Sequence, residues 1–156
     1  MGCSLCRAPK PITPAQRARI TAILEHWYEA GYDRKSDPGV RMGRWFGFQS
    51  SAEQIAAWDA DIKEKFEKDY DNYCMGEYTG WPHDRDGRLA AVLLLDQFPR
   101  SMFRGTAKAF ATDDKASSIS YKAVKNDEVW KEYEVFEKQF LLLPLQHAEN
   151  RSYLQL

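Results

Sequence analysis

An unbroken apolar run in the middle of the chain most constrains what the chain can fold into. Residues 88–105 read RLAAVLLLDQFPRSMFRG, and every residue from Leu89 to Leu95 is apolar. This run is too short to span a bilayer, which takes about 20 apolar residues. A helix that is apolar on all sides must be enclosed by other elements. The sequence therefore predicts a buried central helix that carries the polar residues after it to the edge of the core.

Two prolines predict where helices end. Pro99 has no backbone N–H and disfavours helical geometry in the residue before it, so we expect the central helix to stop or kink near Phe98. Pro144 lies within FLLLPLQHAENRSYLQL, where we expect a break followed by a terminal helix that carries His147 and Glu149.

Apolar residues recur at helical spacing on both sides of the central run. Capping boxes at Thr13–Gln16 and Ser51–Gln54 start two amphipathic helices. Thr112, followed by two acidic residues, is expected to cap a third amphipathic helix. A fourth is expected from residue 126 to residue 140. Residues 32–50 are rich in glycine and charge and are expected to form a loop. Its aromatic residues are expected to plug the core, with stacking on a ligand as the alternative; they are Trp45, Phe46 and Phe48. No segment shows the alternation of a strand over more than a few residues, so the predicted fold class is all-α, with about six helices in antiparallel pairs.

Size and charge limit the classes of function open to the chain. It has 156 residues, 44 % of them hydrophobic and 13 % aromatic, which suffices for one packed domain. We expect residues 13–156 to form that domain and residues 1–12 to be a flexible basic tail. The net charge of -1 gives no overall field that favours nucleic acid, so no nucleic-acid partner is expected. Three cysteines do not make a disulfide framework and no secretory signal is visible, so the expected location is the cytoplasm.

The first residues carry a lipidation pattern. Gly2 is followed by Cys3, with Cys6 close by and basic residues behind it. This resembles the N-termini of dually acylated eukaryotic proteins, with myristate on Gly2 and palmitate on the cysteines. A second acyl chain or a basic patch makes such attachment stable, so peripheral membrane attachment is one expectation. Position 6 departs from the pattern, which prefers Ser or Thr there. The alternative is an unmodified tail, as expected in a bacterium.

Residues 88–113 closely resemble an uncharacterised, mainly bacterial family, the domain of unknown function 924 (DUF924). Its signature is a Leu-rich helix followed by a series of fixed residues. These are Asp96, Gln97, Phe98, Pro99 and Arg100, then Phe103, Arg104 and Gly105, then Ala109, Phe110 and Asp113. An upstream Trp-Phe element at 45–46 and a downstream Pro-Leu-x-His-x-Glu element at 144–149 are also similar. The resemblance covers most of residues 20–150. It implies a fold similar to tetratricopeptide repeats, an all-helical superhelix, and it implies no activity.

The sequence also departs from this family. Family members have Asn where Ser101 stands and Ser where Ala148 stands, so a hydroxyl at the second position is absent here. They also continue for a further helical segment, whereas this sequence stops at Leu156. One expectation is therefore a superhelix that is incomplete or is closed by another chain, as in a homo-oligomer.

Six polar residues form the candidate site. They are Asp96, Gln97, Arg100, Arg104, His147 and Glu149. Grouped in a cleft, they offer carboxylates, a histidine base and two guanidinium groups able to clamp an anion. Paired with one another, they would instead satisfy buried charges where the central helix bends. No metal site is expected, because no H-E-x-x-H pattern or Cys/His cluster is present. No cofactor is expected, because there is no phosphate loop, nucleophile elbow or dinucleotide fingerprint.

Two functions fit the sequence, which assigns no activity by itself. The first is a helical interaction module that binds a peptide or a partner protein, tethered to a membrane if its N-terminus is acylated. The second is a small hydrolase-like enzyme with His147 or Glu149 as base and Arg100 or Arg104 as anion clamp. Convergence of these side chains in a cleft favours the enzyme, and sealed, paired contacts argue against it.

Overall fold

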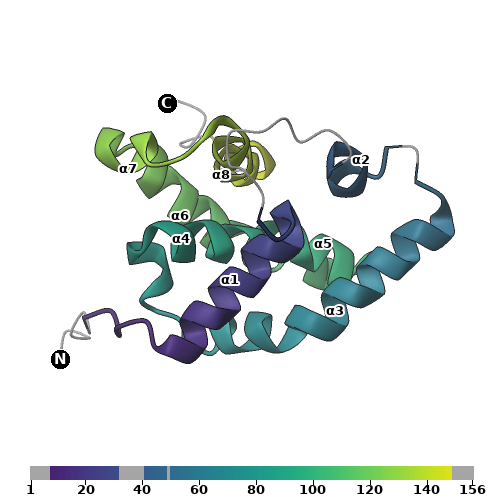
Figure 1. The fold of residues 1–156 in the computed structure, drawn as a ribbon, viewed down its shortest axis with the longest axis horizontal. Helices are drawn as coiled ribbons and strands as arrows, with labels where there is room; N and C mark the ends of the chain where they lie inside the picture. Colours follow the sequence, from purple (N-terminus) through teal and green to yellow (C-terminus); the bar gives the residue numbers. More distant parts are fainter. Residues whose placement is uncertain (1–7, 32–40, 49, 149–156) are drawn as a thin grey trace.

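A computed structural model of the chain describes residues 8–31, 41–48 and 50–148. Within these ranges all regular structure is helical, which confirms the all-α fold class (Figure 1). The α-helices are α1 (Pro14–Tyr28), α2 (Arg41–Phe46), α3 (Ala52–Cys74), α4 (Arg85–Val92), α5 (Phe98–Met102), α6 (Asp113–Val124), α7 (Asp127–Lys131) and α8 (Val135–His147). Two 3₁₀ turns, η1 (Trp81–His83) and η3 (Ala107–Phe110), and one π-helical turn, η2 (Leu93–Gln97), join them.

The predicted buried run lies at the centre of the molecule. It belongs to a continuous helical rod formed by α4, η2 and α5, residues 85–102, which we call the central rod. Every side chain from Leu89 to Leu95 is 0 % exposed. Helices α1, α6 and α8 pack against α4, and α3 packs against η2 and α5 (Figure 1). These neighbouring helices enclose the rod, as an all-apolar run requires.

The central rod does not stop at Pro99, because the π-helical turn accommodates the proline. The N–H of Phe98 donates to the carbonyl of Leu93, five residues back. A regular helix would pair the carbonyl of Leu95 with the N–H that Pro99 lacks. Here the hydroxyl of Thr112 donates to that carbonyl at 2.7 Å. Thr112 therefore stands at the N-cap position of α6 but makes no capping hydrogen bond, so the capping role predicted for its side chain is wrong.

Two further predictions of helix boundaries near the C-terminus are wrong. The helix expected from 126 to 140 is divided into α7 and α8, because Glu134 and Glu137 form a capping box that starts a new helix. Pro144 does not break the chain but lies inside α8, which continues to His147. A proline in a helix removes one hydrogen bond, and burial of Phe140, Leu141 and Leu145 on either side of it offsets that loss.

Part of the expected 32–50 loop is helical. Residues 41–46 form α2, which is anchored by Trp45. The indole N–H of Trp45 donates to the carbonyl of Trp27 at 2.8 Å, and its ring stacks on the Trp27 ring. Trp45 is buried as expected, whereas Phe48 is 64 % exposed, so the prediction that Phe48 plugs the core is wrong.

The predicted helix starts of α1 and α3 are confirmed. Thr13 and Ser51 each accept a hydrogen bond from the backbone N–H three residues on. The side chains of Gln16 and Gln54 in turn accept a hydrogen bond from the backbone N–H of the cap residue. Local sequence signals therefore suffice at these two helix ends.

The residues just before α1 lie against the turn that precedes the central rod. The backbone N–H of Lys10 donates to the Thr79 hydroxyl at 3.2 Å. A Cβ atom at Gly80 would lie 2.2 Å from the Lys10 carbonyl oxygen, so this close approach requires glycine. The lipidation candidates Gly2, Cys3 and Cys6 lie outside the described residues. Among the helices that the structure describes, none has the length and apolar composition needed to cross a membrane.

Candidate functional site

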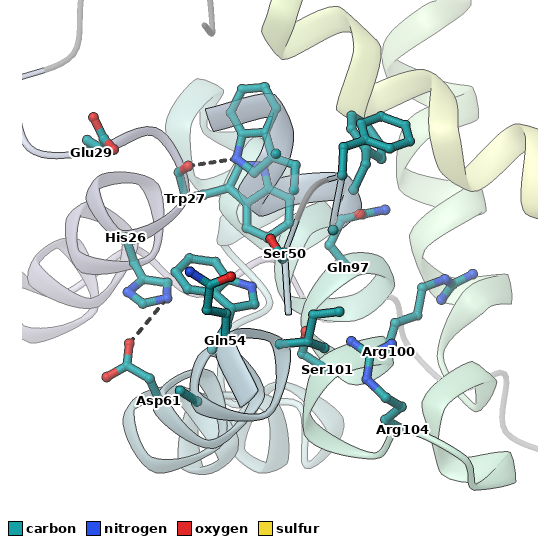
Figure 2. Close-up of a pocket in the computed structure, with 18 of the residues that line it drawn as sticks. His26, Trp27, Glu29, Ser50, Gln54, Asp61, Gln97, Arg100, Ser101 and Arg104 are labelled. Carbon is teal, nitrogen blue, oxygen red and sulfur yellow. Dashed lines mark hydrogen bonds and ion pairs between the residues drawn. The ribbon is translucent and has the colours of Figure 1, made fainter. Parts of the chain in front are cut away.

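A broad cleft of about 1550 Å³ opens beside the central rod. Its walls come from the end of α1, from α2, from the first half of α3, from α5 and from the end of α8 (Figure 2). Pockets for small molecules usually enclose roughly 300–1,000 Å³. The cleft is therefore large enough for a longer ligand such as a peptide segment.

Aromatic side chains form one part of the cleft. They are Trp27, Trp45, Phe46, Phe48 and Trp58. The rings of Trp27 and Trp45 stack with their centroids 6.0 Å apart and belong to the core. Phe48, by contrast, is exposed at the edge of the cleft with its ring 5.9 Å from that of Phe46. Phe48 thus offers an apolar surface that a ligand can cover.

A histidine of α1 and two charged residues of α3 line the cleft and contact one another. The imidazole of His26 stacks on the Trp58 ring at 4.6 Å, and its Nε2 atom lies 3.7 Å from Asp61. Lys65 also pairs with Asp61, at 2.7 Å. Figure 2 shows His26 and Asp61 across the cleft from Arg100 and Arg104.

Four of the six predicted site residues meet around one buried carboxylate. Asp96 is 0 % exposed, and its carboxylate accepts a hydrogen bond from the side-chain amide of Gln97. The Nδ1 atom of His147 lies 2.9 Å from Asp96 Oδ1. Arg100 donates to the Asp96 carbonyl at 2.8 Å, and its guanidinium lies 3.5 Å from the carboxylate. The end of α8 is thereby brought to the π-helical turn of the rod.

Both guanidinium groups proposed as anion clamps already face carboxylates. Arg100 makes two hydrogen bonds to Asp113, at 3.0 and 3.1 Å. Arg104 lies apart from the cluster and makes two hydrogen bonds to Asp59 of α3. The bond to Asp59 raises the pKa of the Arg104 guanidinium above its usual value. A ligand anion would have to compete with both pairs. Glu149 lies outside the described residues.

Asp59 and Asp113 are site residues that sequence reasoning missed. Nothing in the sequence singles out Asp59, one of several charged residues between the apolar positions of α3, yet its side chain is only 15 % exposed. Asp113 was expected only as a favourable charge in the first turn of α6. Its place in the DUF924-like signature, 13 residues after Arg100, was the one available signal that it serves the cluster.

A second hollow, of about 770 Å³, adjoins the cluster on another side. Its lining includes Phe110 and Asp113, and it shares Arg100 and His147 with the cleft. The guanidinium of Arg100 lies over the Phe110 ring, 5.2 Å from its centroid. Arg100 and His147 therefore stand between two solvent-accessible spaces. Within the described ranges, no group of three or more His, Cys, Asp or Glu side chains could hold a metal ion.

The cluster and the cleft fall within a region shared with a known family. The family model described as "Bacterial protein of unknown function (DUF924)" matches residues 23–155. The chain belongs to the DUF924 family. A similar solved structure is described as "Structure of Protein of Unknown Function ATU0120 from Agrobacterium tumefaciens". It is 30 % identical, with a TM-score of 0.70, and the match covers 89 % of this chain and 69 % of that one. No protein with curated annotation matches. Membership of DUF924 therefore indicates the fold of the chain but assigns it no activity.

Proposed function

We propose that this DUF924 protein is an interaction module that binds a peptide segment of a partner in the cleft. The observation that carries the proposal is the size and lining of the cleft, about 1550 Å³ with an exposed phenyl ring at its edge. Burying an exposed aromatic side chain such as Phe48 under a ligand contributes about 1.5–3 kcal/mol to the free energy of binding. An apolar side chain of the partner supplies that cover.

Two glutamines support a peptide as the ligand. The Oε1 atom of Gln54 accepts from the N–H of Ser51, and the Nε2 atom of Gln97 donates to Asp96. The opposite atoms, Gln54 Nε2 and Gln97 Oε1, have no hydrogen-bond partner among the described residues. Both side chains line the cleft (Figure 2). One free donor and one free acceptor match the C=O and N–H of a peptide backbone.

The proposal is tested by selecting peptides from a displayed library and measuring their affinity by fluorescence anisotropy. We expect Phe48→Ala to weaken the selected peptide at least about tenfold, since about 1.4 kcal/mol is a factor of ten. Met75→Ala is the matched control, because Met75 is 68 % exposed but lies beyond the other end of the 23-residue α3. A library without binders, or equal losses in the two variants, would reject the cleft as a peptide site.

A hydrolase-like enzyme is the second candidate, and one observation favours it. The contact between His147 and the buried Asp96 is the arrangement in which a carboxylate orients a histidine base. The engagement of Arg100 and Arg104 by carboxylates argues against an anion clamp. If the protein hydrolyses chromogenic ester or amide substrates, and His147→Gln abolishes that hydrolysis, the proposal of an enzyme replaces that of an interaction module.

A further inference from the structure

We infer that Asp96 holds His147 in a single tautomer, which presents the Nε2 atom as a hydrogen-bond acceptor for a main-chain N–H group of the bound peptide. The identity of the ligand rests on the proposed function. The tautomer rests on contacts within the protein alone.

The geometry at His147 poses a choice between two hydrogen bonds. Its Nδ1 atom lies 2.9 Å from Asp96 Oδ1 and also 2.9 Å from Arg100 Nη2. A ring nitrogen either donates one proton or accepts with one lone pair. It therefore bonds to the carboxylate as a donor or to the guanidinium as an acceptor, and not to both.

The surroundings of Asp96 decide the choice. The carboxylate faces donors from Gln97 and Arg100, so it acts as an acceptor. An unprotonated Nδ1 would place a second acceptor 2.9 Å from the fully buried oxygen with no proton between them. Such a contact is repulsive, and more so where water is excluded. A proton on Nδ1 leaves a donor–donor contact with Arg100 Nη2, also at 2.9 Å. That contact costs less, because the Arg100 side chain is 24 % exposed and its Nη2 atom also donates to Asp113 at 3.1 Å.

A proton on Nδ1 leaves the Nε2 atom of a neutral ring as an acceptor. That atom has no partner among the residues that the structure describes. The His147 side chain is 30 % exposed and lines both the cleft and the adjoining hollow. The side chain of Gln97 also lines the cleft, and its free Oε1 atom is a second acceptor. Two acceptors next to the central rod select a ligand that presents N–H donors there. A peptide backbone does so at nearly every residue.

The first test is nuclear magnetic resonance of the ¹⁵N-labelled protein in alkaline buffer. Long-range ¹H–¹⁵N correlations report the tautomer of each of the three histidines, and His147→Gln assigns the signals of His147. We expect Nδ1–H for His147. An Nε2–H ring, a rapidly exchanging mixture or a doubly protonated ring would overturn the inference. This result needs no ligand.

A variant of Asp96 tests whether this residue fixes the tautomer of His147. Asp96→Asn replaces an acceptor with an amide whose NH₂ group can donate to Nδ1, so we expect His147 to switch to the Nε2–H form. If the folded variant retains the wild-type tautomer, Asp96 is not the residue that fixes it.

The second test uses a peptide selected on the cleft and scanned by N-methylation of one backbone amide at a time. We expect one position to cost about three- to tenfold in affinity for the wild type and nothing in His147→Leu. Equal costs in the two proteins would overturn the inference while the proposed function stands. If the tautomer is as expected but no peptide binds, the proposed function fails instead.

Discussion

Thr112 shows how one side chain can serve a distant element in place of its own helix. It is 3 % exposed, and its hydroxyl pairs with the Leu95 carbonyl that the proline leaves without a donor. We expect Thr112→Val to lower the free energy of unfolding by about 1–3 kcal/mol, because a buried carbonyl is then unsatisfied. Denaturant titration measures this loss.

The chain contains a matched control for this change. The hydroxyl of Thr106 donates to the Phe103 carbonyl, also at 2.7 Å, but Thr106 is exposed. Water can replace that bond, so we expect Thr106→Val to change stability by no more than about 0.5 kcal/mol. If the two variants lose equal stability, burial of the Leu95 carbonyl is not the cause.

Sequence reasoning identified the residues of the cluster better than their partners. Asp96, Arg100 and His147 could be named because they flank an apolar run or belong to the DUF924-like elements. The structure brings these three side chains together, and their role as a functional site stays a prediction. The pairing of Arg104 with Asp59 spans 45 residues, and no local pattern encodes such a distance. The free atoms of Gln54 and Gln97 could not be predicted either, because they depend on which end of each amide the fold uses.

Helix α1 is joined to the start of α4 by a charged contact that should make stability depend on pH. Arg17 makes two hydrogen bonds to Asp84, the N-cap residue of α4, and these hold the pKa of the Asp84 carboxyl below its usual value. A depressed pKa in the folded state contributes stability above the unfolded value of about 4. That contribution is lost as the pH falls through the pKa of Asp84 in the folded state, which lies below its pKa in the unfolded state.

We therefore expect Asp84→Asn to flatten the acid side of the stability profile. Asparagine still caps the helix but carries no charge. Between about pH 5 and pH 3, the variant should lose less free energy of unfolding than the wild type. Glu128→Gln is the control, since Glu128 is 85 % exposed in a surface pair with Lys131. An unchanged acid limb in Asp84→Asn would show that this contact does not link α1 and α4 energetically.

Helices α4 and α8 are joined by a buried ion pair between Arg85 and Glu137, whose side chain is 1 % exposed. We expect Arg85→Ala to cost about 3–5 kcal/mol, because it leaves a buried carboxylate without its cation. Combining Arg85→Met with Glu137→Gln removes both charges and keeps the capping box of α8. The double variant should regain at least half of the loss in chemical denaturation. A double variant no more stable than Arg85→Ala would contradict this account.

At the scale of elements, starts of helices were predictable and interruptions were not. The capping boxes of α1 and α3 are local, so four residues suffice to recognise them. Pro99 lies in the first turn of α5, directly after the π-helical turn that interrupts the regular helix. Pro144 looks like a break in the sequence, but it lies inside α8, where buried neighbours surround it. Helix α2 depends on Trp45 reaching Trp27, which is a tertiary contact. At such positions tertiary packing overrides the local helix propensity of the sequence.

The central rod explains why the whole fold class was predictable from one stretch. Seven enclosed residues demand helices around them, and α1, α3, α6 and α8 all contact the rod. The stacking of helix pairs as in tetratricopeptide repeats remains an expectation.

Attachment to a membrane concerns the whole molecule and stays a prediction. If Gly2 is acylated, Gly2→Ala should move the protein from the membrane fraction to the soluble fraction of its own cells, because myristate is then absent. Quantitative immunoblotting after ultracentrifugation measures the shift. Cys74→Ala, which alters an exposed cysteine elsewhere, is the control. Identical fractionation of wild type and Gly2→Ala would exclude tethering.

The enclosed rod also matters while the protein is being made. The ribosome must extend the chain from residue 95 to residue 147 before α8 is complete, which takes roughly 3–10 s at roughly 5–20 residues per second. During that time the nascent chain carries seven consecutive apolar residues without α6 and α8, two of the four helices that cover them in the folded protein. Association with chaperones or with other nascent chains should therefore be strongest in those seconds of translation.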